Sequence, residues 1–192
     1  MARVAAHVFV DDLGHLQLRD SDAHHLAKVL RLRPGEAVTA SDGRGGMLEC
    51  RWDGASVVAA PGAVASYDEG PSPVITVGFA LTKADRPEWT VQKLTETGVD
   101  RVVVLVSERC VAKWPPAGVP RQMARLQEVA RQASMQSRRS WLPELAGPVD
   151  FRHLVASSPA PALALAVPGA SPLSLSSPTL LIGPREAGPS RS

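Results

Sequence analysis

Several residue types are scarce in this sequence, and each scarcity excludes a class of protein. Aromatic residues make up 4% of the 192 residues, which argues against the base-stacking sheets of RRM-type domains. Cys50 and Cys110 lie far apart and fit no zinc-ligand spacing, so we expect two buried, reduced thiols in a cytoplasmic protein without a metal site. No apolar run approaches the length of a membrane span, and the N-terminus MARVAAHVFV lacks the layout of a signal peptide.

The motifs of several common enzyme classes are also missing. The sequence contains no Walker loop, no Ser-His-Asp order and no paired-carboxylate motif. His24 and His25 would diverge by about 100° on a helix, so they cannot hold one metal ion together, and we expect one packed and one exposed histidine. The run Gly43–Gly46 is too short for a dinucleotide-binding loop and predicts a hairpin turn.

The sequence does contain a core-forming composition and an uneven distribution of charge. Hydrophobic residues make up 44% and charged residues 21%, with a net charge of +2. The stretch from residue 101 to residue 141 contains eight basic and two acidic residues, a local excess of 8 − 2 = 6 positive charges. Such a patch suits a polyanion, most simply nucleic acid, although a solvated helix face explains it equally well.

The stretch 81–114 is the segment around which the rest of the chain is organised. An acidic N-cap and a proline at 85–88 predict the start of a helix, and Gly98 stands where a left-handed C-cap is needed. The unbroken apolar run 102–106 predicts a parallel strand covered on both faces. Because ligands of open α/β sheets collect beyond the carboxyl ends of strands, we expect residues 107–110 to line a site.

Residues 1–70 predict a small β-barrel that is interrupted by one helix. Short apolar segments between Gly and Pro turns are typical of strands, and closure into a barrel removes their exposed edges. The helix is expected from Ser21 to Arg31. The expected strands are 7–10, 16–19, 37–41, 47–52 and 56–60.

A polar, proline-containing linker at 67–73 precedes a second predicted domain, 74–192. Apolar strand candidates alternate there with helical segments, which predicts a parallel α/β sheet. A helix that begins at Pro120 turns Leu126 and Ala130 toward the core and Arg131 toward the opposite, polar side. The expected strands are 74–80, 102–106, 162–167 and 179–182.

Basic residues in both predicted domains are candidate RNA contacts. Contacts with phosphate position RNA and do not read its sequence. Arg138 and Arg139 end the basic helix, where they suit bidentate recognition of a phosphate or carboxylate, or instead cap helix carbonyls. The candidates are Lys28, Arg31, Arg33 and Arg44 in the first domain and Arg121, Arg125, Arg131, Arg138 and Arg139 in the second.

Five ordered motifs give the sequence a resemblance to a known family. They are HHLAKVLRLRPGEAVTASDGRG, LTKADRPEWTVQKLTETGVD, LVSERCVAKW, QSRRSWLPEL and LLIGP. Together they resemble the ribosomal RNA small subunit methyltransferase E family of the SPOUT superfamily. The resemblance implies an N-terminal PUA-like RNA-binding barrel and a SPOUT-type parallel α/β domain with a trefoil knot.

The same resemblance implies an activity, a cofactor and partners. Members of the family work as homodimers and use S-adenosyl-L-methionine to methylate N3 of a uridine in small-subunit (16S) ribosomal RNA. Lys83, Arg109 and Arg139 are then the candidates for holding RNA or stabilising the uridine anion. The candidate cofactor residues, after the last predicted strand, are Leu181, Ile182, Gly183 and Pro184.

Two departures from the family pattern modify these expectations. Met135 stands where the family usually has glutamate, and Arg185 follows Gly183-Pro184 where the family reads GPEGG. The family usually continues beyond this point with a further cofactor loop, the threaded segment of the knot and a final helix. We therefore expect an incomplete knot, a weakened dimer and a 192-residue form that binds the cofactor weakly and is inactive. The alternative is a non-catalytic RNA-binding or ribosome-assembly protein with a degenerate SPOUT domain.

Overall fold

The chain folds into two compact units. The computed structural model describes residues 4–84, 86–106, 110, 112–157, 163–166, 169, 174–176 and 178–183. The first unit comprises Met1–Gly70 together with Arg131–Leu142, and the second comprises Pro71–Ala130 together with Pro143–Ser192. The segment Arg131–Leu142 therefore packs with the first unit, although it lies within the range 74–192 that the sequence assigned to the second domain.

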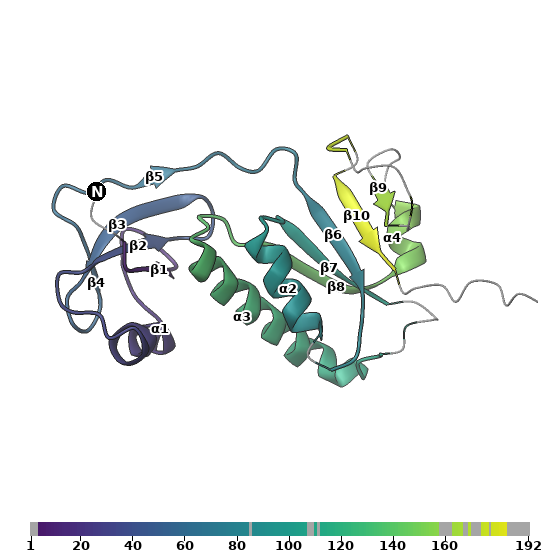
Figure 1. Cartoon of the computed structure of the whole chain (residues 1–192), viewed down its shortest axis with the longest axis horizontal. Coiled ribbons are helices and arrows are strands. Elements are labelled where there is room, and N and C mark those ends of the chain that lie inside the picture. Colours follow the sequence, from purple (N-terminus) through teal and green to yellow (C-terminus); the bar gives the residue numbers. More distant parts are fainter. Residues whose placement is uncertain are drawn as a thin grey trace, which may run out of the picture. The chain divides into compact units, whose positions relative to one another are not determined.

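The first unit is built on a small five-stranded sheet (Figure 1). β1 pairs in parallel with β2, β2 and β3 form an antiparallel hairpin, and β4 and β5 both pair with β3. Its core combines Val8, Leu26, Val38 and Trp52, all nearly inaccessible. The strands are β1 (Ala6–Phe9), β2 (Ala37–Ser41), β3 (Gly46–Trp52), β4 (Val57–Ala59) and β5 (Ser66–Tyr67).

One short helical segment interrupts these strands, as predicted, but its geometry differs from expectation. It begins as α1 (Asp20–His24) and continues as the π-helix η1 (His25–Val29). His24 and His25 are both exposed, so the expectation that one of them packs was wrong. The strand expected at 16–19 was also wrong, because this segment is irregular and Leu16 and Leu18 pack against the core from a loop.

The second unit contains a five-stranded sheet in the order β8-β7-β6-β10-β9, and every neighbouring pair is parallel. A parallel α/β domain was predicted from the alternation of apolar strands and helical segments, and this prediction is confirmed. The strands are β6 (Thr76–Ala80), β7 (Arg101–Val106), β8 (Glu144–Asp150), β9 (Leu163–Leu165) and β10 (Thr179–Ile182).

Helices cover both faces of this sheet (Figure 1). The core on one face joins strand residues to Val91 of α2 and Leu126 of α3, and the core on the other joins Leu105 and Leu181 to Leu154 of α4. Burial on both faces accounts for the unbroken apolar character of β7. The helices are α2 (Arg86–Glu96), the 3-10 turn η2 (Pro116–Gly118), α3 (Val119–Ser137) and α4 (Phe151–Ser157). Gly98 has a φ of +94°, as expected for its C-cap.

β8 and α4 were not predicted from the sequence. β8 contains Gly147 and Pro148, which are typical of turns, but it lies at the end of the sheet order, where a proline is tolerated. The register shifts between Val103 and Leu105, so that Gly147 and Pro148 together oppose Val104. This bulge places Gly147 at a φ of +111°.

Both cysteines are buried and free, as the sequence predicted. Within the described residues, none of the helices is long and apolar enough to cross a membrane. The described part of the chain also holds no cluster of three or more His, Cys, Asp or Glu side chains suited to a metal ion.

Candidate functional site

The carboxyl edge of the parallel sheet in the second unit is the first candidate site. Three neighbouring strands end there: β6 leads into Thr82 and Lys83, β9 into Ala166, and β10 into Gly183. The loop after β7, where the sequence predicted a site at 107–110, lies outside the described residues apart from the buried Cys110. Because the strands are parallel, these loops share one edge of the sheet, which is where α/β proteins bind ligands.

The four candidate cofactor residues take different positions at this edge. Leu181 is fully buried and its carbonyl accepts a 2.9 Å hydrogen bond from the Ala166 N–H, so its side chain belongs to the core. Ile182 is 40% exposed. Among the described residues, none lies within 4 Å of a Cβ added at Gly183, so they leave room for a ligand beside the backbone there. Pro184 lies outside the described residues.

One further polar group at this edge was missed by the sequence analysis. The Thr82 hydroxyl is buried and has no hydrogen-bond partner among the described residues. A buried hydroxyl without a partner is unfavourable by about 1–3 kcal/mol, and a ligand that bonds to it would remove this cost. Its place directly after the central strand was the only signal in the sequence.

The three candidate catalytic residues are distributed over both units. Lys83 is exposed at the sheet edge of the second unit. Arg109 lies outside the described residues. Arg139 is half-buried and belongs to the first unit, where its backbone N–H donates to the Ser134 carbonyl at 3.0 Å. A shared role for these residues therefore stays a prediction.

In the second unit, α3 presents the candidate RNA contacts Arg121 and Arg125. Both are exposed. The Arg125 Nε lies 3.0 Å from Glu88 Oε1, and the arginine side chain nonetheless remains 65% exposed. Glu88 is largely buried, with its second carboxylate oxygen unpartnered among the described residues. Arg125 thus joins α3 to α2 and still offers part of its guanidinium to solvent.

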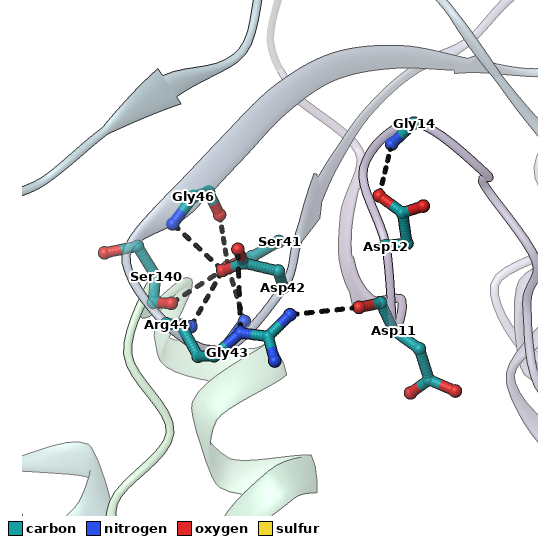
Figure 2. A network of polar contacts seen from close by, with 9 residues as sticks. All are labelled: Asp11, Asp12, Gly14, Ser41, Asp42, Gly43, Arg44, Gly46 and Ser140. Atoms are coloured by element: carbon teal, nitrogen blue, oxygen red, sulfur yellow. Dashed lines mark hydrogen bonds and ion pairs between the residues drawn. The ribbon is translucent and has the colours of Figure 1, made fainter.

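In the first unit, the turn between β2 and β3 is held by a network of polar contacts (Figure 2). The Asp42 carboxylate accepts hydrogen bonds from the N–H groups of Arg44 (2.8 Å) and Gly46 (2.9 Å). Gly43 and Gly45 have φ values of +73° and +92°, as the predicted hairpin turn requires. The Arg44 side chain is 72% exposed, lies 4.0 Å from Asp42, and donates to the Asp11 carbonyl at 3.2 Å. The network therefore presents Arg44 on a well-defined turn.

The segment that follows α3 completes this network. The Ser41 hydroxyl lies 2.7 Å from the Gly46 carbonyl oxygen and 2.9 Å from that of Ser140, which Figure 2 shows from close by. The Ser140 carbonyl also accepts the Gly45 N–H at 3.1 Å, and the Ser140 hydroxyl bonds to the Asp68 carboxylate at 2.6 Å. The segment after α3 is therefore part of the first unit's structure.

His7 links β1 and β2 to the same segment. Its Nδ1 lies 2.8 Å from the Thr39 hydroxyl and its Nε2 3.1 Å from the Arg139 carbonyl oxygen. A carbonyl only accepts, so Nε2 carries the proton and Nδ1 accepts from Thr39. Burial of the imidazole lowers the pKa of His7 to about 4, the Arg139 carbonyl opposes this shift, and the charge of Arg138 adds to it.

The remaining basic candidates of the first unit differ in what their side chains contact. Lys28, Arg31 and Arg33 are exposed, whereas Arg138 is exposed but donates to the Val4 carbonyl at 2.7 Å. The structure contradicts the prediction that Arg131 lies on the exposed, polar face of the basic helix. Only 6% of its side chain is exposed, and its guanidinium holds the Asp22 carboxylate of α1 through two nitrogens, one of them at 3.1 Å. Arg131 is therefore removed from the candidate RNA contacts.

Comparison with known proteins agrees with this architecture. A family model described as the RNA methyltransferase PUA domain matches residues 18–51, and a model described as the RNA methyltransferase domain matches residues 69–184. A small PUA-type sheet and a SPOUT-type parallel α/β domain define the class of the fold, so this expectation is confirmed. The chain belongs to the RNA methyltransferase domain family.

Several relatives are known by sequence and structure. The chain is 34% identical to a ribosomal RNA small subunit methyltransferase E of Mycobacterium bovis, covering 79% of this chain and 60% of that protein. It is 31% identical to the Synechocystis protein of the same name, covering 72% of this chain and 45% of that protein. The chain thus spans less than two thirds of the length of these relatives.

Two solved structures are similar in fold. One is a ribosomal RNA small subunit methyltransferase E from Neisseria gonorrhoeae bound to S-adenosyl methionine, with a TM-score of 0.72, 25% identity, and coverage of 93% of this chain and 79% of that chain. The other is the methyltransferase Lpg2936 from Legionella pneumophila, with a TM-score of 0.74, 20% identity, and coverage of 95% and 79%.

Proposed function

We propose that this protein takes part in S-adenosyl-L-methionine-dependent methylation of N3 of a uridine in small-subunit ribosomal RNA. The observation that carries the proposal is the match of residues 69–184 to the RNA methyltransferase domain, on a chain that also carries a PUA domain. The N. gonorrhoeae relative bound to S-adenosyl methionine supports the cofactor. Action in the cytoplasm as a homodimer is part of the proposal, and sedimentation across a range of protein concentrations tests the dimer.

The residues at the carboxyl edge of the second unit's sheet fit such a cofactor. Gly183 leaves its backbone open to a ligand, and the buried Thr82 hydroxyl provides a polar group that still needs a partner. In the proposed arrangement, Ile182 supplies apolar contact and the Gly183 backbone supplies hydrogen bonds. Small-molecule sites commonly combine apolar walls with a few polar groups in this way.

The chemistry assigns a role to Lys83, which is exposed at this edge. S-adenosyl-L-methionine, when bound, supplies the methyl group. N3 of uridine lies on the Watson–Crick edge, so the base must be unpaired or extruded before it can react. N3 also has to lose its proton, and a cation close to the base stabilises the resulting anion. We assign this role to Lys83, with Arg109 and Arg139 as further candidates for the same role or for holding the RNA.

Substitution at Gly183 tests the cofactor site directly. Because no described residue lies within 4 Å of a Cβ added at this position, Gly183→Val is expected to leave thermal stability unchanged and to weaken S-adenosyl-L-methionine binding at least tenfold in titration calorimetry. Equal affinity of the variant and the unsubstituted chain would place the cofactor elsewhere. RNA binding without any cofactor binding would favour the non-catalytic alternative.

A paired lysine substitution tests the proposed cation. Because the 192-residue form is expected to be inactive, the substitution is made in a chain extended with a family-like C-terminal segment. There Lys83→Ala is expected to lower methyl transfer to small-subunit ribosomal RNA by about 10²-fold, the usual effect of removing one group that stabilises a developing negative charge, with little change in cofactor affinity. Lys93→Ala is the control, because Lys93 lies on α2 and pairs with Glu96 at 2.6 Å. Similar rates for both variants would exclude Lys83 from the reaction.

A further inference from the structure

The segment Lys28–Arg31, which we call the η1 turn, protrudes from the first unit. All four of its residues are exposed, and among them Val29 is 62% and Leu30 44% exposed. A helical turn that lies along a protein surface turns at least one of four consecutive side chains inward. Four exposed neighbours therefore indicate a projecting turn, and two of its side chains are large and apolar.

The backbone of the η1 turn is firmly held although its side chains are exposed. The Leu30 N–H donates to the His25 carbonyl at 2.9 Å, and the Leu32 N–H donates to the Leu26 carbonyl at 3.0 Å. Leu26 is 1% exposed and fixes the base of the turn in the core. π-helical turns are rare and are frequently found at functional sites. The exposed apolar side chains thus project from a structure with a defined shape.

Arg31 has a backbone conformation that its residue type does not favour. Its φ is +53°, a region that glycine usually occupies at the end of a helix and that other residues adopt at a cost. The end of the helix explains why residue 31 adopts a positive φ. It does not explain why this residue is an arginine and not a glycine. Arg138 provides the comparison: it has a φ of +56° at the end of α3, and its guanidinium donates to the Val4 carbonyl at 2.7 Å. Arg31 has no such structural contact among the described residues.

The charged side chains of the η1 turn, Lys28 and Arg31, and that of the nearby Arg33 are all positive. Within the described part of the chain, no hydrogen bond or ion pair engages the side chains of Lys28, Arg31 or Arg33. The nearby Glu36 carboxylate accepts the backbone N–H of Arg33 at 2.6 Å. Three cations without partners beside two exposed apolar side chains suit a partner that combines phosphates with apolar flat surfaces. RNA with unpaired bases offers both, whereas in duplex RNA the base faces are stacked.

We propose that the η1 turn is a docking site for an unpaired segment of RNA, with Lys28, Arg31 and Arg33 contacting phosphates and Val29 and Leu30 contacting exposed bases. The proposal rests on the proposed RNA-binding function and specifies the form of RNA that this surface takes. RNA binding would also explain why an arginine occupies position 31, where the backbone conformation favours glycine. The guanidinium would be kept there because it binds phosphate.

Fluorescence anisotropy with a labelled single-stranded RNA and the matching duplex, across a series of salt concentrations, tests the proposal. Arg31→Gly removes the side chain and suits the backbone. We expect it to raise the melting temperature, weaken single-strand binding several-fold and flatten the log–log salt slope by about 0.7. The double substitution Val29→Ser with Leu30→Ser is expected to weaken single-strand binding at least fivefold, with an unchanged salt slope and unchanged duplex binding.

The control is Val64→Ser, which removes an apolar side chain that is 86% exposed in another loop of the same unit, and we expect it to leave RNA binding unchanged. Unaltered binding by Arg31→Gly would overturn the proposal. The proposal would also be overturned if the double substitution weakened binding to single-stranded and duplex RNA equally. The same holds if the double variant lost binding to anionic lipid vesicles but still bound RNA as the unsubstituted chain does. Because methyl transfer is measured separately, any of these outcomes leaves the proposed activity standing.

Discussion

His7 is a buried, neutral imidazole whose hydrogen bonds join β1 and β2 to the residues after α3. Its pKa falls from an ordinary value of 6.5 to about 4. Above about pH 6.5 the side chain is neutral in both the folded and the unfolded chain. Below it, the unfolded chain binds a proton that the folded chain does not, so the free energy of unfolding decreases by about 3 kcal/mol between pH 6.5 and 4.

We therefore expect NMR titration of the His7 ring to give an apparent pKa near 4, and urea unfolding of the first unit to need less denaturant at pH 5 than at pH 7.5. His7→Gln keeps a donor and an acceptor but does not titrate, so the variant should lose part of this pH dependence. A His7 ring that titrates near 6.5 would contradict the hydrogen-bond assignment.

Arg131 shows what single residues in a sequence do not reveal. The spacing of apolar positions in α3 correctly predicted the buried Leu126 and Ala130. The same helical pattern placed Arg131 on the exposed side, but Arg131 meets the Asp22 carboxylate more than a hundred positions earlier in the chain. A helical pattern describes one helix against one core, and α3 packs successively in two units.

Among the elements, β8 depends on Gly147. Any other residue at this position would force β8 or β7 to shift, because its Cβ would clash with the β7 backbone. Gly147 has a φ of +111°, and an added Cβ would lie 2.5 Å from the Val104 carbonyl oxygen of β7. Backbone atoms of a central strand cannot move aside easily. The sequence gave no warning of this, because a glycine followed by a proline is more typical of a turn than of a strand.

Gly147→Ala is expected to destabilise the second unit by about 2–5 kcal/mol, of which roughly 1–3 kcal/mol comes from backbone strain and the rest from overpacking. Gly98→Ala is the matched control, because Gly98 also has a positive φ, +94°, but no described residue lies within 4 Å of an added Cβ. It should show the strain alone. Equal midpoints of denaturation for the two variants would mean that β8 moves freely relative to β7.

The elements predicted most accurately were strands whose sequence is an uninterrupted run of apolar residues. β10 was predicted with the observed bounds, and β7 began one residue earlier than expected. The candidate cofactor residues Ile182 and Gly183, which the family resemblance implied, lie at the end of this strand and just after it. The Thr82 hydroxyl was missed because its significance depends on the absence of a partner among the described residues, a property of packing that a sequence does not display.

For the molecule as a whole, the main consequence is that residues 1–70 lack part of their own structure. The bonds of Asp22, His7 and Ser41 to residues 131–142 belong to the first unit. Without Arg131, Asp22 would be a buried charge without its partner, a loss of about 3–5 kcal/mol against a typical total stability of about 5–15 kcal/mol.

A fragment of residues 1–70 is therefore expected to show no cooperative thermal unfolding by circular dichroism. The same fragment joined through a Gly/Ser linker to residues 131–142 should recover it. Cooperative unfolding of residues 1–70 alone would show that the contacts of Asp22, His7 and Ser41 with the later segment add little to the stability of the unit.

The division of the first unit into two separate stretches of chain also imposes an order in time. During synthesis the strands of the first unit leave the ribosome early, but the partners of Asp22 and Ser41 are made only once residues 131–142 have been added. At roughly 5–20 residues per second, the interval between residues 70 and 142 lasts about 4–14 s. For that interval the β2–β3 turn lacks Ser140, while β6, α2 and β7 of the second unit are being synthesised. The N-terminal unit, although its strands are made first, should therefore reach its final structure only after residue 142, when the second unit still awaits β8, β9 and β10.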